Sequence, residues 1–400
     1  MTQLLTYPDI DPQQWNELVQ SSPTATWFQT KEAYEFYAAN PAEMTPFAVG
    51  VVELEVKGTE NGKADTPASR LIASSPHRLA SDSDHASTPY TLYPTPALNG
   101  VIVGYITLER NAMKQFFTRR AIIYGGPLLA EDISEEALSA LLGAVAQCPA
   151  SRLIASSPHR LASDSDHAFT PYTLHPTPIF IESRNFHDYS KWRNIFEANG
   201  FAYQPHLNFH VDTTQPWETI ENNIGKHRRK YIRLSYRDGV EVELEPTLHQ
   251  VKEYYAVLQD LYRTKVKMPL QPWLFFERLY YLPSCKYLLV LYNNQVVGGS
   301  ICMTLKNHGV YEWYACGKDG MFRNIHPSSV TKYVGMKYAS DNGYKVFDMM
   351  GAGKPNEAYG VRDFKAEFGG KLVEHGRFLC VRNPLLYWIG KIAVKLLKRK

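Results

Sequence analysis

Apolar residues follow a pattern along the first half of the chain that predicts strands and an intervening helix. The runs over 47–58 and 100–110 predict a pair of strands, and the run over 120–130 predicts a third. The segment 134–147 has apolar residues at helical spacing, and 178–183 returns to the strand pattern. Paired strands therefore lead into a strand–helix–strand unit.

The second half follows a similar order. Its pattern predicts a helix over 216–239, a strand over 240–246, helices over 248–266 and 272–282, a hairpin turning at Asn293-Asn294, a strand over 310–317, a helix over 328–343, and strands over 345–350 and 371–381. Antiparallel strands that lead into a strand–helix–strand unit, twice over, predict a mixed α/β fold with two sheets.

A duplicated block interrupts the first half. Residues 67–96 recur at 149–178. The copies differ at two aligned positions, which are Ser87 against Phe169 and Tyr93 against His175. Their Ser, Asp and His residues could suggest a Ser-His-Asp or metal site. Such sites need a rigid strand or helix to hold their geometry, and this Ser- and Pro-rich segment has too few large apolar residues to order itself. We interpret the copies as loop inserts and expect no metal site.

The chain is predicted to divide into three parts. We expect a first domain over 1–214 that carries both inserts, and a catalytic domain over 215–383. The tail, 384–400, has apolar residues on one helical stripe and lysines on the other face. That pattern is typical of a helix lying on an anionic membrane surface. Docking of the helix onto its own domain is the alternative.

Composition narrows the class of protein. Hydrophobic residues make up 44% and charged residues 21%, as in a globular protein. The net charge is +3, and the five basic residues from Lys391 to Lys400 leave the rest of the chain at −2, which argues against a general nucleic-acid coat. Five cysteines without a close pair predict reduced thiols. With neither a signal peptide nor a spanning apolar stretch, we expect a cytoplasmic protein, attached at the inner face of the membrane if the tail binds lipid.

A dense row of positive charge lies in the predicted helix after residue 225. Six of the twelve residues from Lys226 to Arg237 are basic, and Arg229, Arg233 and Arg237 share one helical face. Forked hydrogen bonds from such arginines suit a diphosphate or a tRNA backbone. We therefore take Arg228, Arg229 and Arg233 as candidate phosphate-binding residues. A solvated helix face is the alternative.

Four segments carry a resemblance to a known family. They are "FQT" at 28–30, "KHRRKYIRLSYRDGVEVE" at 226–243, "VFDMMGAG" at 346–353 and "YGVRDFKAEFGG" at 359–370. In this order they resemble the FemAB-type acyltransferases, which are tandem GNAT-fold proteins. The resemblance implies two GNAT-like domains, each a mixed, mostly antiparallel sheet flanked by helices.

The resemblance also implies a reaction. FemAB enzymes transfer an aminoacyl group from aminoacyl-tRNA to a peptidoglycan precursor, which is lipid-linked or nucleotide-linked, and they need no bound cofactor. Two alternatives stay open. One is an acyl-CoA-dependent N-acyltransferase that acts on an amino sugar, and the other is a non-catalytic binding protein of the same fold.

The resemblance assigns site residues in the second half. Lys365 matches the lysine of the family's Phe-Lys motif, which is proposed to steady the reacting carbonyl, and Asp348 ends the preceding strand. Glu312 and Tyr314 are predicted to share one face of the central strand. We take Lys365, Asp348 and Glu312 as catalytic candidates. The segment between Asp348 and Lys365 supplies the remaining ligand-binding candidates: Gly351, Gly353, Tyr359 and Gly360.

These glycines could instead serve only as turns, and Asp348 only as a cap.

The choice of acyl donor is constrained by an absent motif. CoA-dependent GNAT enzymes have a glycine-rich loop after the central strand, whose amides bind the pyrophosphate at a helix N-terminus. Neither 318–330 nor 124–134 has that pattern. The sequence therefore favours aminoacyl-tRNA over acyl-CoA as the donor.

Overall fold

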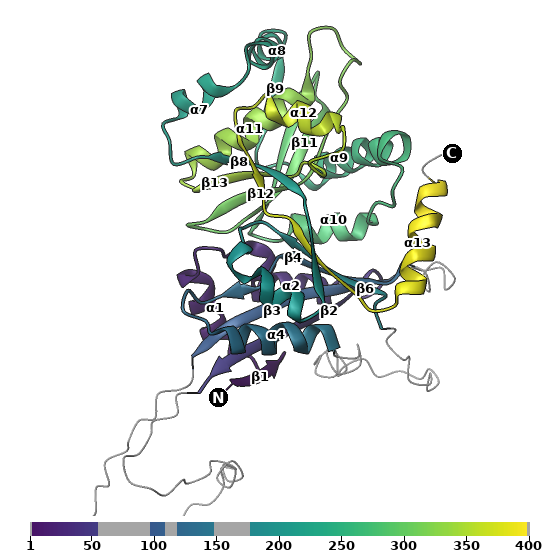
Figure 1. Cartoon of the computed structure of the whole chain (residues 1–400). Helices are drawn as coiled ribbons and strands as arrows, with labels where there is room; N and C mark the ends of the chain where they lie inside the picture. Colours follow the sequence, from purple (N-terminus) through teal and green to yellow (C-terminus); the bar gives the residue numbers. More distant parts are fainter. Residues whose placement is uncertain (1, 55–96, 109–117, 148–176, 398–400) are drawn as a thin grey trace, which may run out of the picture.

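The computed structural model describes residues 2–54, 97–108, 118–147 and 177–397. Within these ranges the chain forms two mixed sheets, one of eight strands and one of seven. Figure 1 shows the two sheets in separate lobes, with the chain crossing between them where β8 and β14 lie. The predicted mixed α/β fold with two sheets is confirmed.

The first sheet has helices on both faces. Its main path runs β1 (Thr2–Thr6), β2 (Met44–Glu53), β3 (Leu98–Thr107), β4 (Arg120–Gly125), β6 (Phe180–Asn185), β15 (Arg377–Val381) and β7 (Phe201–Gln204), and β5 (Leu128–Leu129) pairs with β3. One core contains buried residues of α1 (Pro12–Ser21) and α2 (Lys31–Ala38). A second core, on the opposite face, contains those of α4 (Glu135–Gln147) and α6 (Arg193–Ala198).

The second sheet is also covered on both faces. Its order is β14 (Lys371–Glu374), β8 (Leu207–Asp212), β13 (Val346–Gly351), β12 (Gly309–Gly317), β11 (Gln295–Thr304), β10 (Cys285–Tyr292) and β9 (Val240–Glu243). One face packs against α7 (Trp217–Asn223), α8 (Lys226–Arg237) and α11 (Pro327–Asp341). The other packs against α9 (Leu248–Leu261), which continues into the π-helical turn η4 (Tyr262–Val266), and α10 (Trp273–Tyr280).

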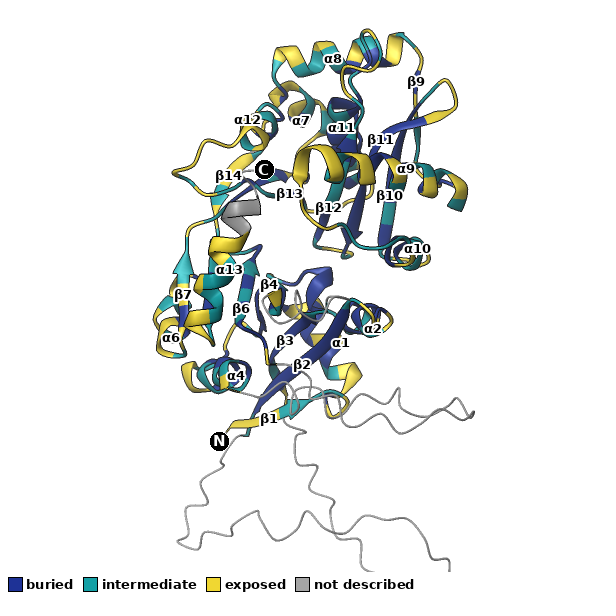
Figure 2. Ribbon diagram, turned by 90° about the vertical axis from the view of Figure 1, so that its right-hand side faces the viewer, coloured by how far each residue is buried: buried dark blue, intermediate teal, exposed yellow. Residues whose placement is uncertain are grey.

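Aromatic side chains join the two halves into one core. Trp313 of β12 lies 5.1 Å from Phe28 and 6.3 Å from Trp27, measured between ring centroids. Phe36 of α2 packs at 5.1 Å against Phe275 of α10. Figure 2 shows buried residues on the facing sides of both sheets. Because buried aromatic area dominates such contacts, the two halves stabilise each other.

The "FQT" segment has a structural role at this junction. Phe28 is fully buried in the aromatic core, and Thr30 caps the N-terminus of α2. The buried amide of Gln29 accepts the N–H of Thr26 (2.8 Å) and donates to the carbonyl oxygen of Gly126 (3.0 Å). It therefore ties the start of α2 to the turn after β4.

The predicted strand over 371–381 is wrong, because it is two strands in different sheets. β14 pairs with β8 in the second sheet, and β15 pairs with β6 and β7 in the first. Gly376 separates them at a φ of 67°, a conformation that favours glycine. β8 belongs to the second sheet although it precedes residue 215. The division into 1–214 and 215–383 stays a prediction, and strand pairing crosses it at β8 and β15.

The predicted helix over 216–239 is also two helices. α7 ends at Asn223 and α8 begins at Lys226, with Gly225 between them. The Gly225 N–H donates to the carbonyl oxygen of Glu367 at 2.8 Å, and a Cβ at Gly225 would lie 3.2 Å from that oxygen. The chain therefore breaks where α12 (Gly360–Ala366) ends close beside it.

Several smaller expectations can be compared with the structure. The hairpin turns at Asn293 and Asn294, which have φ values of 50° and 58°. Cys285, Cys302, Cys316 and Cys380 are free and buried, and Cys148 lies outside the described residues. Both copies of the duplicated block lie outside them too, apart from 177–178. Within the described ranges, no helix combines the length and the hydropathy that crossing a membrane requires.

Candidate active site

β12 and β13 run parallel but separate at the centre of the second sheet. They pair only from Gly309 to Tyr311 and from Val346 to Asp348. Beyond that point, the register between β13 and β8 also shifts. The ends of the two strands therefore leave backbone groups without ladder partners, in the region where most of the predicted site residues lie.

Met350 makes a sharp turn at this separation. Its φ is 61°, which is uncommon for a residue other than glycine and is often found at functional sites. Asp348 Oδ1 accepts the Met350 N–H at 2.6 Å. From the other side, the Lys365 ammonium donates to the carbonyl oxygens of Met349 and of Gly351 (2.9 Å). Two of the predicted catalytic residues thus hold one strained turn.

Lys365 is buried, and its donors are directed at the backbone. A third carbonyl oxygen, that of Met350, lies 3.3 Å from Nζ. Burial lowers the pKa of Lys365 to about 8, and the charge of Asp348 opposes this shift. The ammonium therefore stabilises the open end of β13.

His210 pairs with Asp348 and was missed by the sequence analysis. It lies on β8 in register with Asp348, and its Nε2 is 3.2 Å from Asp348 Oδ2. The Asp348 side chain is 1% exposed, whereas that of His210 is 19% exposed. Burial opposes both shifts, yet the interaction raises the pKa of His210 and lowers that of Asp348. Only the pairing of distant strands reveals this histidine.

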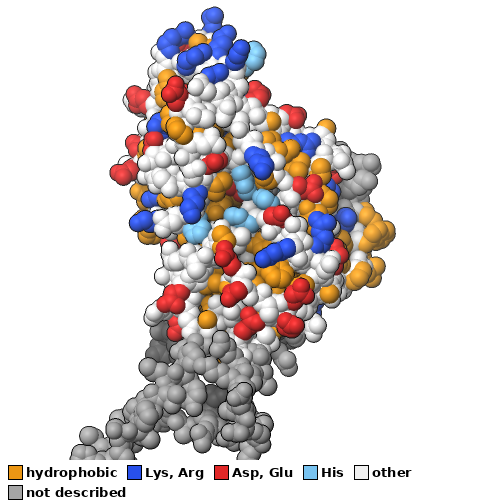
Figure 3. Space-filling model, turned by 60° about the vertical axis from the view of Figure 1, so that its left-hand side comes forward, with side chains coloured by type: hydrophobic (Ala, Val, Ile, Leu, Met, Phe, Trp, Pro, Cys, Tyr) orange, Lys and Arg blue, Asp and Glu red, His pale blue; other side chains and the backbone are white. Residues whose placement is uncertain are grey.

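Other histidines surround this pair. The ring of His375 lies 5.1 Å from that of His210, and the ring of His187 lies 6.5 Å from that of His375. Figure 3 shows histidine side chains gathered between the two lobes on one face. In the described part of the chain, no three His, Cys, Asp or Glu side chains are placed to hold a metal ion.

Glu312 faces away from Tyr314, so the prediction that they share a face is wrong. Tyr314 pairs with Ile301 and Glu312 pairs with Cys302, which leaves Trp313 as an extra residue on β12. This β-bulge reverses the alternation of side chains. Glu312 consequently points toward α11, and its carboxylate forms a buried ion pair with the Lys332 ammonium.

Tyr314 lies on the opposite face, where its ring is 5.1 Å from that of Phe276 of α10. The ion pair places Glu312 in the core between β12 and α11, beside the open strand ends. Glu312 Oε1 has no hydrogen-bond partner among the described residues.

The predicted phosphate-binding arginines of α8 occupy different environments. Arg228 forms a two-pronged ion pair with Glu367, with Nε–Oε2 3.1 Å and Nη2–Oε1 2.9 Å, and its guanidinium lies 4.5 Å from the Phe364 ring centroid. Arg228 thereby anchors α8 to α12, which carries Lys365.

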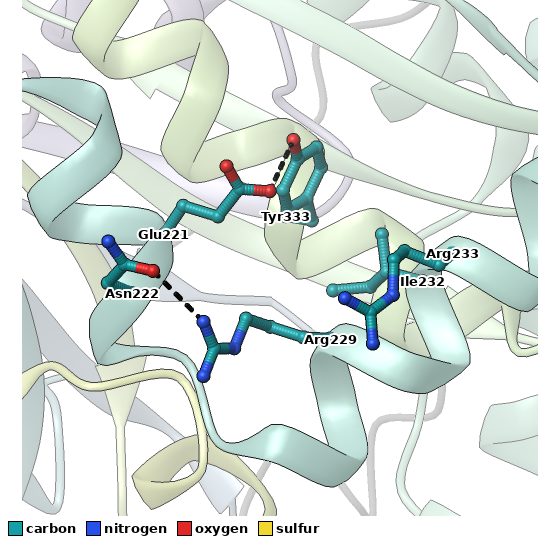
Figure 4. A pocket seen from close by; sticks show the side chains of 6 residues that line it. All are labelled: Glu221, Asn222, Arg229, Ile232, Arg233 and Tyr333. Atoms are coloured by element: carbon teal, nitrogen blue, oxygen red, sulfur yellow. Dashed lines mark hydrogen bonds between the residues drawn. The ribbon is translucent and has the colours of Figure 1, made fainter.

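Arg229 and Arg233 line a pocket of about 240 Å³ between α7, α8 and α11. Figure 4 shows both side chains beside it, with Asn222 accepting a hydrogen bond from Arg229 (3.0 Å). The opposite wall carries Glu221, whose carboxylate accepts a hydrogen bond from Tyr333 (3.2 Å). Figure 3 shows basic side chains gathered at the far end of the molecule, where α8 lies. The exposed basic residues there are Lys226, Lys230, Arg233 and Arg237.

The glycine-rich segment forms the loop between β13 and α12. Gly353 has a φ of 78°, and a Cβ there would lie 2.9 Å from the ring of Tyr359. Tyr359 is 40% exposed, and a Cβ at Gly360 would meet nothing within 4 Å. Gly353 is therefore required by the fold of the loop. Gly360 lies in open space beside the exposed tyrosine.

The start of α11 has no free backbone donors. Pro327, the first residue of α11, has no N–H, and the Ser328 N–H donates to Asp319 Oδ1 at 3.2 Å. The next two N–H groups donate to the carbonyl oxygen of His326. Asp319 therefore occupies the position where a bound anion would contact this helix end.

The structure therefore brings Asp348, Lys365, Gly351 and the unpredicted His210 together at the open ends of β12 and β13. Arg228 connects this group to α8, while Arg229 and Arg233 line the separate pocket between α7, α8 and α11. Glu312 lies on the other face of the sheet, against α11. This group joins a buried carboxylate, a mostly buried imidazole and a buried ammonium around a strained turn.

Comparison with known proteins agrees with the motifs. Residues 291–395 match the model of the FemAB family. No curated protein sequence matches the chain. Among solved structures, the crystal structure of FemX has a TM-score of 0.61 at 14% identity, covering 97% of this chain and 99% of that one. A tandem GNAT protein from the clavulanic acid biosynthesis pathway has a TM-score of 0.49 at 7% identity, covering 95% and 98%.

The likeness to FemX shows the fold, and the FemAB match confirms the resemblance carried by the motifs. Residues 291–395 are therefore similar to the FemAB family, and this match points to an acyltransferase. Over the whole chain, the likeness to FemX is one of fold.

Proposed function

We propose that this FemAB-like acyltransferase transfers an aminoacyl group from aminoacyl-tRNA to an amine of a peptidoglycan precursor. The observation that carries the choice of donor is the start of α11. The first N–H of this helix, that of Ser328, donates to the Asp319 carboxylate, and the next two donate to the backbone carbonyl oxygen of His326. A carboxylate at this position repels the pyrophosphate of CoA, which helix N-terminal amides bind in CoA-dependent enzymes of this fold.

The basic face of α8 suits the donor. Lys226, Lys230, Arg233 and Arg237 are exposed on this helix. A series of cations along one helix matches the repeated phosphates of a polynucleotide better than a single diphosphate. Arg228, held by Glu367, places α8 next to the helix that carries Lys365. Phosphates bound along α8 would therefore lie on a helix that adjoins α12.

His210, whose side chain is 19% exposed, is suited to accept the proton of the attacking amine. Asp348 holds its Nε2 and stays ionised, so the imidazole is oriented and its protonated form is stabilised. The amine nitrogen bonds to the ester carbonyl carbon, and the bond from that carbon to the ribose oxygen of tRNA breaks. The amine proton passes through His210 to that oxygen. Lys365 and Asp348 position the Met350 turn beside the reacting groups.

The tail helix favours an acceptor linked to lipid. α13 (Pro384–Leu397) docks through Tyr387, whose ring lies 5.2 Å from that of Phe180. Leu385, Trp388 and Ile392, at helical spacing, are 67%, 61% and 39% exposed. Apolar residues with lysines around them are attracted to anionic bilayers. The tail thus supports a position at the inner face of the membrane.

A second pocket supports the acyl-CoA alternative. It has a volume of about 460 Å³ between the end of α9 and the loop after β12, where Lys265 and Lys318 lie beside Asp260 and Asp319. This volume would hold part of an acyl-CoA molecule. The two carboxylates on its wall disfavour a diphosphate, so we rank this reaction second.

Transfer assays with the purified full-length chain separate the two donors. We expect label from aminoacyl-tRNA to reach a nucleotide-linked or lipid-linked peptidoglycan precursor, and label from acyl-CoA to stay unreacted. The R229Q/R233Q double variant should raise the KM for aminoacyl-tRNA more than it lowers kcat, because it removes phosphate contacts. Transfer from acyl-CoA alone would overturn the proposal and favour the amino-sugar reaction.

A further inference from the structure

Two half-buried arginines share a single carboxylate where β6 and β15 pair. Arg184 donates from Nε and Nη2 to Glu182 Oε2, both at 2.8 Å, and Arg377 donates from Nη1 to Oε1 at 2.8 Å. The arginine side chains are 21% and 26% exposed, and that of Glu182 is 15% exposed. Two cations and one anion leave this group with one positive charge in excess.

The surrounding polar groups do not neutralise that charge. Arg184 Nη1 donates to the hydroxyl of Tyr124 at 2.8 Å, and Arg377 Nη2 lies 2.9 Å from His206 Nε2. Burial, with Arg377 beside it, lowers the pKa of His206 to about 3, so this imidazole is uncharged at neutral pH. Because partly buried charge is costly without a counter-ion, the group favours an anion that completes it.

The group also lies next to the candidate active site. The Arg184 guanidinium is 5.1 Å from the ring centroid of Tyr124, whose ring lies 5.9 Å from that of Trp313 on β12. On its other side, His206 approaches Gly351, where a Cβ would lie 3.2 Å from Nε2. Gly351 is one of the residues bound by Lys365.

We propose that Arg184 and Arg377 form an oxyanion-binding site that receives a phosphate or carboxylate group of the acceptor. The site is distinct from the α8 arginines, and its assignment to the acceptor rests on the proposed function. Each guanidinium carries more N–H hydrogens than its contacts with Glu182, Tyr124 and His206 use, and the remaining ones can donate to the oxygens of either group. Tyr124 provides a flat wall on the side of the aromatic core.

Isothermal titration of the full-length chain with sodium pyrophosphate, and separately with sodium acetate, tests the proposal at matched ionic strength. We expect saturable binding. The anion that binds more tightly shows whether the site prefers phosphate or carboxylate. R184Q and R377Q should each weaken that binding about tenfold or more, since each removes a charge-assisted contact. Either substitution leaves the other arginine paired with Glu182, so the fold should persist, which near-UV circular dichroism checks.

Removal of the shared carboxylate gives an effect of opposite sign. E182Q raises the excess charge and should tighten anion binding, whereas R263Q, at an exposed ion pair on η4, should leave it unchanged. Absence of saturable binding, or binding that R184Q and R377Q do not weaken, overturns the proposal. Binding lost only in R229Q/R233Q also overturns it, and leaves the α8 donor site of the proposed function standing.

Discussion

At the residue scale, the site depends on groups that hold the backbone around Met350. Asp348 accepts its N–H, and Lys365 donates to the carbonyl oxygens on either side. A non-glycine residue at a φ of 61° costs free energy that the surroundings must offset. A change to Asp348 or Lys365 therefore alters both the backbone turn and the charge of the site.

Replacement of Lys365 by methionine tests its backbone role. The side chain of Met has a similar length but no donor, so three carbonyl oxygens near Nζ lose their partner. We expect the free energy of unfolding to fall by about 1–3 kcal/mol, the cost of buried unsatisfied groups. Urea denaturation measures this change. An unfolding midpoint equal to that of the wild type would show that the ammonium is not structural. K337M, at an exposed pair on α11, is the control.

The role of His210 as proton acceptor predicts a pH dependence. Burial opposes the effect, but Asp348 raises the pKa of His210 above its ordinary value, and Lys371 opposite it on β14 acts against that rise. Neutral His210 accepts the proton, so kcat/KM should rise as pH increases through this pKa and then level off. The neighbouring His375 and His187 have lowered pKa values and stay neutral across that range.

D348N should shift the rising limb of the pH profile of kcat/KM to lower pH, because it removes the charge that stabilises the protonated imidazole of His210. Its amide oxygen can still accept the Met350 N–H, which preserves the turn. The pH profile of kcat/KM is the measurement, and H210Q should abolish the limb. An unchanged limb in D348N would exclude His210 as the titrating group.

At the element scale, the helices that border the site are connected through their ends. The break at Gly225 brings α8 against the end of α12, and Arg228 reinforces that contact. The β-bulge at Trp313 turns Glu312 toward α11 while Trp313 stays in the aromatic core. The tail helix α13 exposes the apolar side chains of Leu385, Trp388 and Ile392.

We expect α13 to bind anionic bilayers. Full-length protein should float with phosphatidylglycerol vesicles and much less with phosphatidylcholine vesicles, and salt should weaken the binding. The L385S/W388S variant should bind about tenfold more weakly or worse, since each large apolar side chain contributes about 1.5–3 kcal/mol when buried. L372S, at a leucine that is 46% exposed on β14, is the control. Equal flotation of the tail variant and the wild type would contradict a lipid-binding role.

At the scale of the whole molecule, strands exchanged between the sheets hold the two halves together. β7 leads directly into β8, and β14 into β15, so each half of the chain completes the sheet of the other. The shared aromatic core reinforces this arrangement. The two halves should therefore unfold as one unit.

Deletion of both copies of the duplicated block should leave the fold intact. Apart from 177–178, the copies lie outside the described residues, between β2 and β3 and between α4 and β6 in the sequence. Removing 67–96 and 149–178 leaves Cys148 and Ile179 to join α4 to β6, within the usual two to six residues for such loops. We expect soluble protein whose Tm lies within a few degrees of the wild type. Loss of soluble protein would show that the copies are structural.

The sequence by itself determined the local elements, the family motifs and the candidate residues Asp348, Lys365 and Arg228. Apolar periodicity and turn residues reveal these features because they act within a few residues of one another. Only the tertiary structure decided that β15 crosses to the first sheet, that Glu312 faces α11 and that His210 meets Asp348. Those outcomes depend on strand pairing between segments more than 130 residues apart and on one bulged residue, which no local pattern records.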